Sequence, residues 1–224
     1  MATHLLTGGG SGIGRVVAER LLERGDDVWL VARSTERAHD LRSDLAGATV
    51  LVADLASPES LGSLELPDAL DSVVHVAGVI ELGSVEELSV DDWAGQLRVN
   101  LVSPAALTRA ALPALRAARG TVVFVNSTAG LNAHARWSAY AASKHGLRAL
   151  ADALRAEEQP HGVRVTSVYP GRTATQMQRK VHQQEGKDYD AADWADPATV
   201  AEAILRVLDL PGDATVTDLT IRPT

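Results

Sequence analysis

Residues 4–25 read HLLTGGGSGIGRVVAERLLERG: a short apolar run, a glycine-rich turn, then apolar residues at helical spacing. A strand that enters a helix through such a turn presents backbone N–H groups and a helix N-terminus to a phosphate. The strict G-x-G-x-x-G spacing is absent, and the glycines follow the pattern Thr7-Gly8-x-x-x-Gly12-x-Gly14. A merely flexible turn is the alternative, but the strand-to-helix context favours a pyrophosphate site.

The rest of the chain continues to alternate between strand and helix. Short apolar runs with strand character lie at residues 27–32, 48–53, 71–76, 120–126, 162–169 and 214–221. Because helical segments separate most of these runs, the strands should form a mostly parallel sheet with helices on both faces. A chain of 224 residues with 46% hydrophobic content can bury one such core. We therefore predict a single α/β domain over residues 1–224, doubly wound and of the Rossmann type.

Composition and charge exclude several classes of protein. The chain has no cysteine, which excludes disulfides, iron–sulfur clusters and thiolate zinc sites, and no metal site is predicted. A net charge of −8 argues against a nucleic-acid surface. No apolar run approaches the length of a membrane span, and the N-terminal residues lack the basic lead and apolar run of a signal peptide. We expect a cytoplasmic protein that binds neither nucleic acid nor membrane.

Ligands of open parallel sheets bind at the carboxyl ends of the strands. The residues that directly follow the first six predicted strands are, in order, the glycine turn, Arg33, Asp54, Ala77-Gly78, Ser127 and Pro170-Gly171. We expect these residues to line one rim of the sheet.

Arg33 bears on the choice of cofactor. In dinucleotide-binding folds the end of the second strand faces the adenine ribose, where a carboxylate bonds the 2′-hydroxyl and an arginine accommodates a 2′-phosphate. Arg33 occupies this end, whereas Asp26 and Asp27 lie at the opposite end of the strand. The pattern favours NADP(H), with NAD(H) as the alternative. A solvated Arg33 that simply opens the next helix is the structural alternative.

Tyr140 and Lys144 lie four residues apart in a predicted helix and should project from the same face. A cation beside a phenol favours the phenolate, so we expect the pKa of Tyr140 to lie below its usual value of about 10. A phenol of that kind can act as a general acid or base near neutral pH. By itself the pair could also be a surface helix with a packed tyrosine and a solvated lysine.

Several motifs together resemble those of the short-chain dehydrogenase/reductase family. They are Thr7-Gly8-x3-Gly12-x-Gly14, Asn100, Ser127, Tyr140-x3-Lys144 and Pro170-Gly171, in this order. The resemblance spans about residues 3–222, essentially the whole chain. It implies a seven-stranded parallel sheet, a nicotinamide cofactor, and the interconversion of a small-molecule carbonyl and an alcohol. It also implies a possible homodimer or homotetramer.

The resemblance further implies a role for each of four catalytic residues. Tyr140 would be the general acid when a carbonyl is reduced, and Ser127 would hydrogen-bond the substrate oxygen. Lys144 would bond the nicotinamide ribose and lower the pKa of Tyr140. Asn100, which lies in an apolar helical run, would hold a water molecule that connects Lys144 to solvent.

A larger set of residues would contact the cofactor. By the resemblance, residues 54–55 would contact the adenine ring, residues 77–78 the adenine ribose, and residues 170–175 the nicotinamide amide and the phosphates. The expected cofactor-binding residues are Thr7, Gly8, Gly10, Ser11, Gly12, Ile13, Gly14, Arg33, Asp54, Leu55, Ala77, Gly78, Asn100, Tyr140, Lys144, Pro170, Gly171, Thr173 and Thr175.

One position departs from the family pattern. The family's usual Asn-Asn-Ala-Gly reads His75-Val76-Ala77-Gly78 here, and the missing asparagine usually ties neighbouring strands together. We expect His75 to be a packed or hydrogen-bonded strand histidine rather than an additional acid.

Substrate specificity is expected to come from residues that the motifs do not cover. Residues 176–196 are polar and predict a substrate lid or a short helical insertion. The residues expected to form a partly aromatic pocket are His134, Trp137, Met177, Tyr189 and Trp194. They do not identify the substrate. A cofactor-sensing regulator that keeps the fold without turnover is the alternative function.

Overall fold

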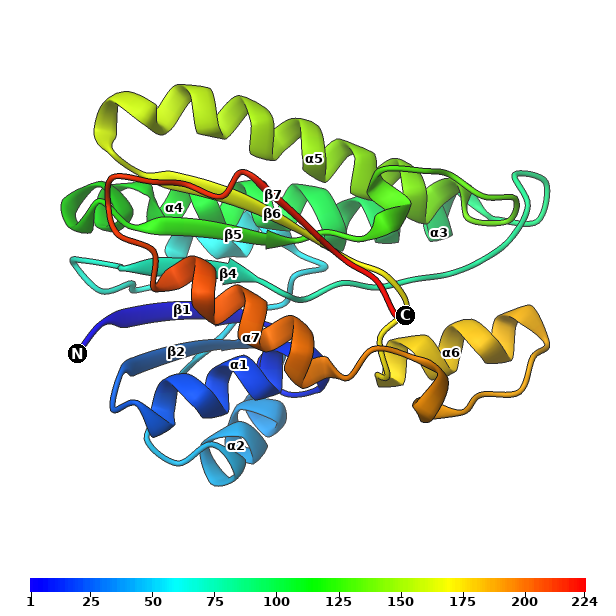
Figure 1. Cartoon of the computed structure of the whole chain (residues 1–224), viewed down its shortest axis with the longest axis horizontal. Coiled ribbons are helices and arrows are strands. Elements are labelled where there is room, and N and C mark those ends of the chain that lie inside the picture. The colour runs from blue at the N-terminus through cyan, green and yellow to red at the C-terminus, as the bar shows by residue number, and fades with distance from the viewer.

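The structure, a computed structural model, describes all residues from 1 to 224. Seven strands form one sheet in the order β3-β2-β1-β4-β5-β6-β7, and every neighbouring pair is parallel (Figure 1). The strands are β1 (Thr3–Thr7), β2 (Asp27–Ala32), β3 (Thr49–Val52), β4 (Ser72–His75), β5 (Thr121–Val125), β6 (Arg164–Pro170) and β7 (Asp218–Ile221). The predicted doubly wound parallel sheet is confirmed.

The order of the strands reverses beside β1. The chain builds outward from β1 to β2 and β3, then returns to the other side of β1 to add β4. Thr7 therefore pairs with Val31 on one side and with His75 on the other. In open α/β sheets, ligands bind in the crevice at such a switch point.

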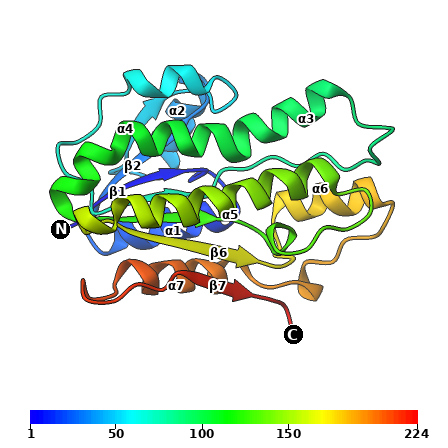
Figure 2. The ribbon, with the colours of Figure 1, turned by 90° about the horizontal axis from the view of Figure 1, so that it is seen from above.

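Helices cover both faces of the sheet (Figure 2). The helices are α1 (Gly12–Glu23), α2 (Thr35–Asp44), α3 (Val90–Leu97), α4 (Ser103–Ala118), α5 (Ser138–Glu158), α6 (Gln176–Glu185) and α7 (Pro197–Leu208). Helices α1, α2 and α7 bury their apolar residues in one cluster, and α4 and α5 bury theirs in a second cluster on the other face. Helix α6 belongs to neither layer and lies beyond the carboxyl ends of the strands (Figure 1).

The central strands are buried on both faces, and their sequences reflect this. All five residues of β5, TVVFV, are buried, as are all four of β4. A parallel strand covered by helices on both sides reads as a continuous apolar run rather than an alternating one. With 4% aromatic residues in the chain, valine and leucine supply most of this core.

The start of the last strand differs from the expectation. Residues 214–217 were expected to begin the last strand, but β7 begins at Asp218. Side chains contribute to holding the backbone before it: Thr166 donates to the carbonyl of Val216. Arg155 donates to the carbonyl of Thr217, which also accepts from the backbone N–H of Ser167 at 2.9 Å. Pro113 lies inside α4. It lies on an exposed face, where water can satisfy the carbonyl that its ring leaves unbonded.

His75 is packed within the core, as expected. Its Nε2 lies 2.9 Å from the Thr108 hydroxyl of α4, and its ring stacks on Phe124 of β5 at 5.0 Å and 8°. The imidazole therefore ties β4 to a helix and to the neighbouring strand. Burial lowers the pKa of His75 to about 3. No helix of the chain is long and apolar enough to cross a membrane.

Candidate active site

A cavity of about 710 Å³ opens at the carboxyl ends of β1, β4, β5 and β6, beside α6. It lies at the edge of the sheet where the sequence placed the site. The predicted site residues that line it are Gly8, Ser11, Gly12, Ile13, Ala77, Gly78, Ser127, Tyr140, Lys144, Pro170, Gly171, Thr173 and Thr175. The predicted residues that do not line it are Thr7, Gly10, Gly14, Arg33, Asp54, Leu55 and Asn100.

Two elements bring the hydroxyl, the phenol and the ammonium together. Ser127 lies two residues after the end of β5, where its Oγ accepts a hydrogen bond from the N–H of Ala129 at 3.1 Å. Tyr140 lies in the first turn of α5, and Lys144 lies one turn later on the same face. The Lys144 Nζ is 5.8 Å from the centroid of the Tyr140 ring and donates to the carbonyl of Val125 at 3.0 Å.

Burial sets the pKa values of this pair, which corrects one expectation. The pKa of Tyr140 was expected to be lowered by Lys144, but burial raises it to about 12, against a smaller lowering by a hydrogen bond with Ser127. Burial also lowers the pKa of Lys144 to about 8. The ammonium binds a backbone carbonyl rather than the phenol, so loss of hydration outweighs its attraction for the phenolate.

Asn100 lies in a π-helical turn, η2 (Arg98–Val102), which joins α3 to α4. Such turns inside helices are frequent at functional sites. The Asn100 amide donates to the carbonyl of Val79 at 2.9 Å and to the Ser143 hydroxyl at 3.0 Å, and it accepts from the Val79 N–H at 2.8 Å. The Asn100 side chain is buried behind the cavity wall, next to Gly78. A Cβ atom added to Gly78 would lie 3.3 Å from the Oδ1 of Asn100 and 3.8 Å from the Nζ of Lys144.

The glycine turn fits the expected dinucleotide. Gly8 and Gly12 have φ angles of +73° and +51°, which favour glycine. A Cβ on Gly8 would lie 2.7 Å from the N–H nitrogen of Ala77, and one on Gly12 would lie 3.0 Å from the Thr175 methyl. The turn therefore packs its backbone tightly while leaving the N-terminus of α1 directed to the cavity, as a pyrophosphate requires. Thr7 Oγ1 accepts from the same Ala77 N–H at 3.2 Å.

The outer part of the site contains a cation that sequence reasoning missed. Arg33 is exposed after β2, and the Arg37 guanidinium donates to the carbonyl of Gly10 at 2.9 Å. Arg37 lies only four residues after Arg33, which could have indicated a second cation near the end of β2. Glu36 also hydrogen-bonds the hydroxyls of Ser34 and Thr35, so a carboxylate shares this end of β2.

The two predicted adenine contacts lie farther along the same edge of the sheet. Asp54 is exposed, and its carboxylate accepts from the N–H of Ala56 at 2.9 Å. Leu55 is partly buried, and its carbonyl accepts a hydrogen bond from the hydroxyl of Ser103.

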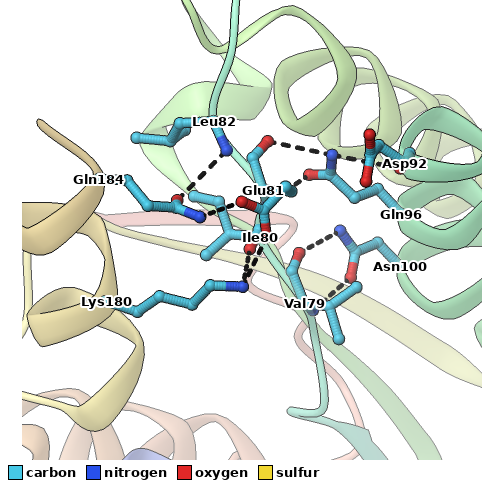
Figure 3. Close-up of polar contacts among 9 residues, drawn as sticks. All are labelled: Val79, Ile80, Glu81, Leu82, Asp92, Gln96, Asn100, Lys180 and Gln184. Atoms are coloured by element: carbon cyan, nitrogen blue, oxygen red, sulfur yellow. Dashed lines mark hydrogen bonds and ion pairs between the residues drawn. The ribbon is translucent and has the colours of Figure 1, made fainter. Parts of the chain in front are cut away.

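Residues 79–82 connect β4 to the rest of the site and are held from two sides (Figure 3). On one side, the amide of Gln96 in α3 bonds both the N–H and the carbonyl of Glu81, at 3.2 and 3.1 Å. On the other side, Lys180 of α6 donates to the carbonyl of Ile80 at 2.9 Å and to the Glu81 carboxylate at 2.7 Å. Gln184 accepts from the N–H of Leu82 and also bonds Glu81. Helix α6 is thereby fastened over the cavity.

The expected aromatic pocket is only partly correct. His134, Trp137 and Met177 line the cavity. Tyr189 and Trp194 do not, because their rings pack against His182 on α6, at centroid distances of 5.3 and 5.2 Å.

Other lining residues lie in segments that the sequence had marked, but they were not named individually. Ile80 and Val181 pack with Tyr140 in a small apolar cluster, and Arg172 and Glu185 form an ion pair. Only the tertiary structure brings the members of these sets together.

Comparison with known proteins identifies the family. Residues 2–186 match the family model described as short chain dehydrogenase. The chain belongs to the short-chain dehydrogenase family. An uncharacterized short-chain type dehydrogenase/reductase of Sinorhizobium fredii is 32% identical over 225 residues, which cover 98% of this chain and 90% of the relative.

Solved structures of family members match the whole fold. An alcohol dehydrogenase from the archaeon Thermococcus sibiricus, complexed with 5-hydroxy-NADP, has a TM-score of 0.86 at 26% identity, covering 100% of this chain and 97% of that one. The closed form of a serine dehydrogenase complexed with NADP⁺ also has a TM-score of 0.86 at 26% identity, covering 99% and 95%. The chain is thus an oxidoreductase of this family, and a nicotinamide cofactor fits its site.

Proposed function

We propose that this protein uses NADP(H) to interconvert a carbonyl compound and a primary or secondary alcohol. One observation carries the proposal: Ser127, Tyr140 and Lys144 share a single cavity with the glycine turn at Gly8 to Gly14. A proton donor, a hydrogen-bond donor and a cation therefore lie beside a site suited to a dinucleotide. Membership of the short-chain dehydrogenase family supports the reaction class.

The catalytic residues act on the oxygen of the substrate. When bound, a nicotinamide would supply the hydride that adds to the carbonyl carbon. The Tyr140 phenol gives its proton to the oxygen as negative charge develops there, and Ser127 donates a hydrogen bond to the same oxygen. A pKa of about 12 keeps Tyr140 protonated at neutral pH, which suits a general acid in carbonyl reduction.

Lys144 and Asn100 would return a proton to Tyr140. One N–H of the Lys144 ammonium is used by the carbonyl of Val125, and the other two remain for the ribose of the cofactor and for a relay. Both amide N–H groups of Asn100 are already hydrogen-bonded, so Asn100 would take part in the proton relay through its Oδ1. This oxygen and the Lys144 Nζ both lie next to Gly78. A water molecule between them would complete the path.

The preference for NADP(H) rests on Arg33 and Arg37. Both are close to the end of β2, where an adenine ribose is expected, and a guanidinium suits a phosphate. Glu36 opposes this preference, because a carboxylate suits a free 2′-hydroxyl. The NADP-type ligands of the two structural neighbours favour the arginines.

Residues 176–196 would act as the substrate lid, because α6 is fastened over the cavity by hydrogen bonds that substrate entry could break and restore.

The protein would work in the cytoplasm, as a homodimer or homotetramer.

Cofactor titration and a substrate panel test the proposed function. We expect NADPH to bind more tightly than NADH, and NADPH absorbance at 340 nm to fall with some members of a panel of neutral aldehydes, ketones and quinones. Tight NADPH binding without turnover on any member would contradict the proposal and favour a cofactor-sensing regulator.

A further inference from the structure

Arg172 is a cation in the cavity wall that already has a partner. It follows β6, and its Nη2 donates to the carboxylate of Glu185, in the last turn of α6, at 2.7 Å. Glu185 is largely buried, with 14% of its side chain exposed, and also accepts from Lys187 at 3.2 Å. Both Arg172 and Glu185 line the cavity, whereas Lys187 does not.

The paired guanidinium lies close to the reacting groups. It stands over the ring of Trp194 at 5.3 Å and over that of Trp137 at 5.9 Å. The Trp137 ring in turn meets the Tyr140 ring edge to face, at 5.9 Å and 71°. A single indole therefore separates Arg172 from the phenol.

Apart from Lys144, the rest of the wall around Tyr140 carries no ammonium, guanidinium or carboxylate. Ile80, Val181 and Met177 pack against the phenol in one apolar cluster. Apart from Arg172 and Glu185, Lys144 is the only Lys, Arg, Asp or Glu that lines the cavity. One of its N–H groups donates to the carbonyl of Val125, and the proposed function assigns the other two to the cofactor ribose and the proton relay. A substrate carboxylate would therefore lose its hydration without gaining an ammonium or a guanidinium that is free to bind it.

We propose that the substrate is a neutral, largely apolar carbonyl compound, and that Glu185 determines this specificity by occupying Arg172. The substrate class rests on the proposed function. Removing the charge of Glu185 would release a guanidinium within the cavity, and a guanidinium binds a carboxylate through two parallel hydrogen bonds. Glu185 acts through Arg172 and is a specificity-determining residue rather than a catalytic one.

A matched pair of substrates tests the specificity. Ethyl benzoylformate and benzoylformate carry the same ketone, but only the second carries a negative charge. With NADPH, the wild type should reduce the ester and strongly disfavour the acid. Glu185→Gln should raise kcat/KM for the acid by about 10- to 100-fold, the value of a charge-assisted hydrogen bond, and leave the ester within about threefold. An unchanged ratio of acid to ester would overturn the proposal.

Three controls assign the gain to Arg172. Glu81→Gln also removes a carboxylate bonded to α6, but Glu81 does not line the cavity, so the acid-to-ester ratio should stay at the wild-type value (Figure 3). Glu185→Gln combined with Arg172→Gln should lose the gain. The KM for NADPH should be unchanged in Glu185→Gln. A lower KM for NADPH, without acceptance of the acid, would show that the released guanidinium binds the cofactor and would contradict the proposal.

A binding assay makes the test independent of turnover. Quenching of the tryptophan fluorescence reports ligands that bind beside Trp137, which lines the cavity. Glu185→Gln should bind benzoate about 10- to 100-fold more tightly than the wild type does, with benzamide affinity unchanged. Equal benzoate affinity in both proteins would refute the role of Glu185. A benzoate gain without NADPH oxidation on any carbonyl would instead refute the proposed function and leave the role of Glu185 intact.

Discussion

Acid should destabilise this protein through one buried imidazole, that of His75. The His75 ring is 2% exposed, and burial lowers its pKa from 6.5 to about 3. In the unfolded chain the same side chain takes up a proton below pH 6.5, whereas in the folded protein it stays neutral down to about pH 3. The unfolded state thus binds more protons in this window, so the stability that His75 contributes above pH 6.5 is lost as the pH falls towards 3.

The size of the effect follows from proton linkage. Between pH 7.5 and pH 5, an imidazole that is neutral when folded and has its ordinary pKa when unfolded costs about 2 kcal/mol of unfolding free energy. The cost grows by about 1.4 kcal/mol for each further pH unit until the folded-state pKa is reached. No discount for solvent screening applies, because the ring is enclosed by Thr108 and Phe124.

Urea denaturation of the wild type and two variants, at pH 7.5 and pH 5, measures this effect. His75→Asn should be less stable at pH 7.5, because it loses the stacking on Phe124, but its loss of stability between the two pH values should be smaller than that of the wild type by about 2 kcal/mol. Thr108→Val removes the hydrogen-bond partner and keeps the buried imidazole, so it should retain the full wild-type pH dependence. Equal pH dependence in His75→Asn and the wild type would refute the reasoning.

Three further predictions concern the cofactor, the acid–base groups and α6. Arg33→Ala should weaken NADPH binding at least about tenfold in a fluorescence titration and leave NADH binding unchanged, and equal NADPH affinity would remove Arg33 from the site. Carbonyl reduction should lose kcat/KM as the pH rises through about 8, where Lys144 loses its proton, and a flat profile to pH 10 would contradict a role for its charge. Lys180→Ala removes a hydrogen bond to the carbonyl of Ile80 and a half-exposed ion pair with Glu81. Helix α6 should therefore be cleaved faster in limited proteolysis, while Tm falls by only a few degrees. Unchanged cleavage would show that Lys180 does not hold α6 in place.

The architecture was predictable because its signals are local. Each central strand is buried on both faces, so its apolar run is continuous, as in β5, and the turn at Gly8 to Gly14 leaves little choice of conformation. The end of the chain was less predictable. Residues 214–217 alternate like a strand, but Thr166 and Arg155, which are distant in sequence, donate side-chain hydrogen bonds to the carbonyls of Val216 and Thr217.

The chemistry of the candidate site was only half predictable. The four-residue spacing correctly placed Tyr140 and Lys144 on one face, but spacing carries no information on burial, which raises the pKa of Tyr140 instead of lowering it. In the same way, no local pattern shows that Glu185 faces Arg172, because α6 is positioned by contacts with residues about a hundred positions earlier, such as the bond from Lys180 to the carbonyl of Ile80.

The most direct test of the account is the turnover of Tyr140→Phe. The substitution removes the phenolic hydroxyl and keeps the ring that packs against Trp137. With a carbonyl substrate that the wild type reduces, kcat should fall by about 100- to 10,000-fold, while the dissociation constant for NADPH stays within about threefold of the wild-type value. Near-normal turnover by Tyr140→Phe would contradict the assignment of Tyr140 as the proton donor.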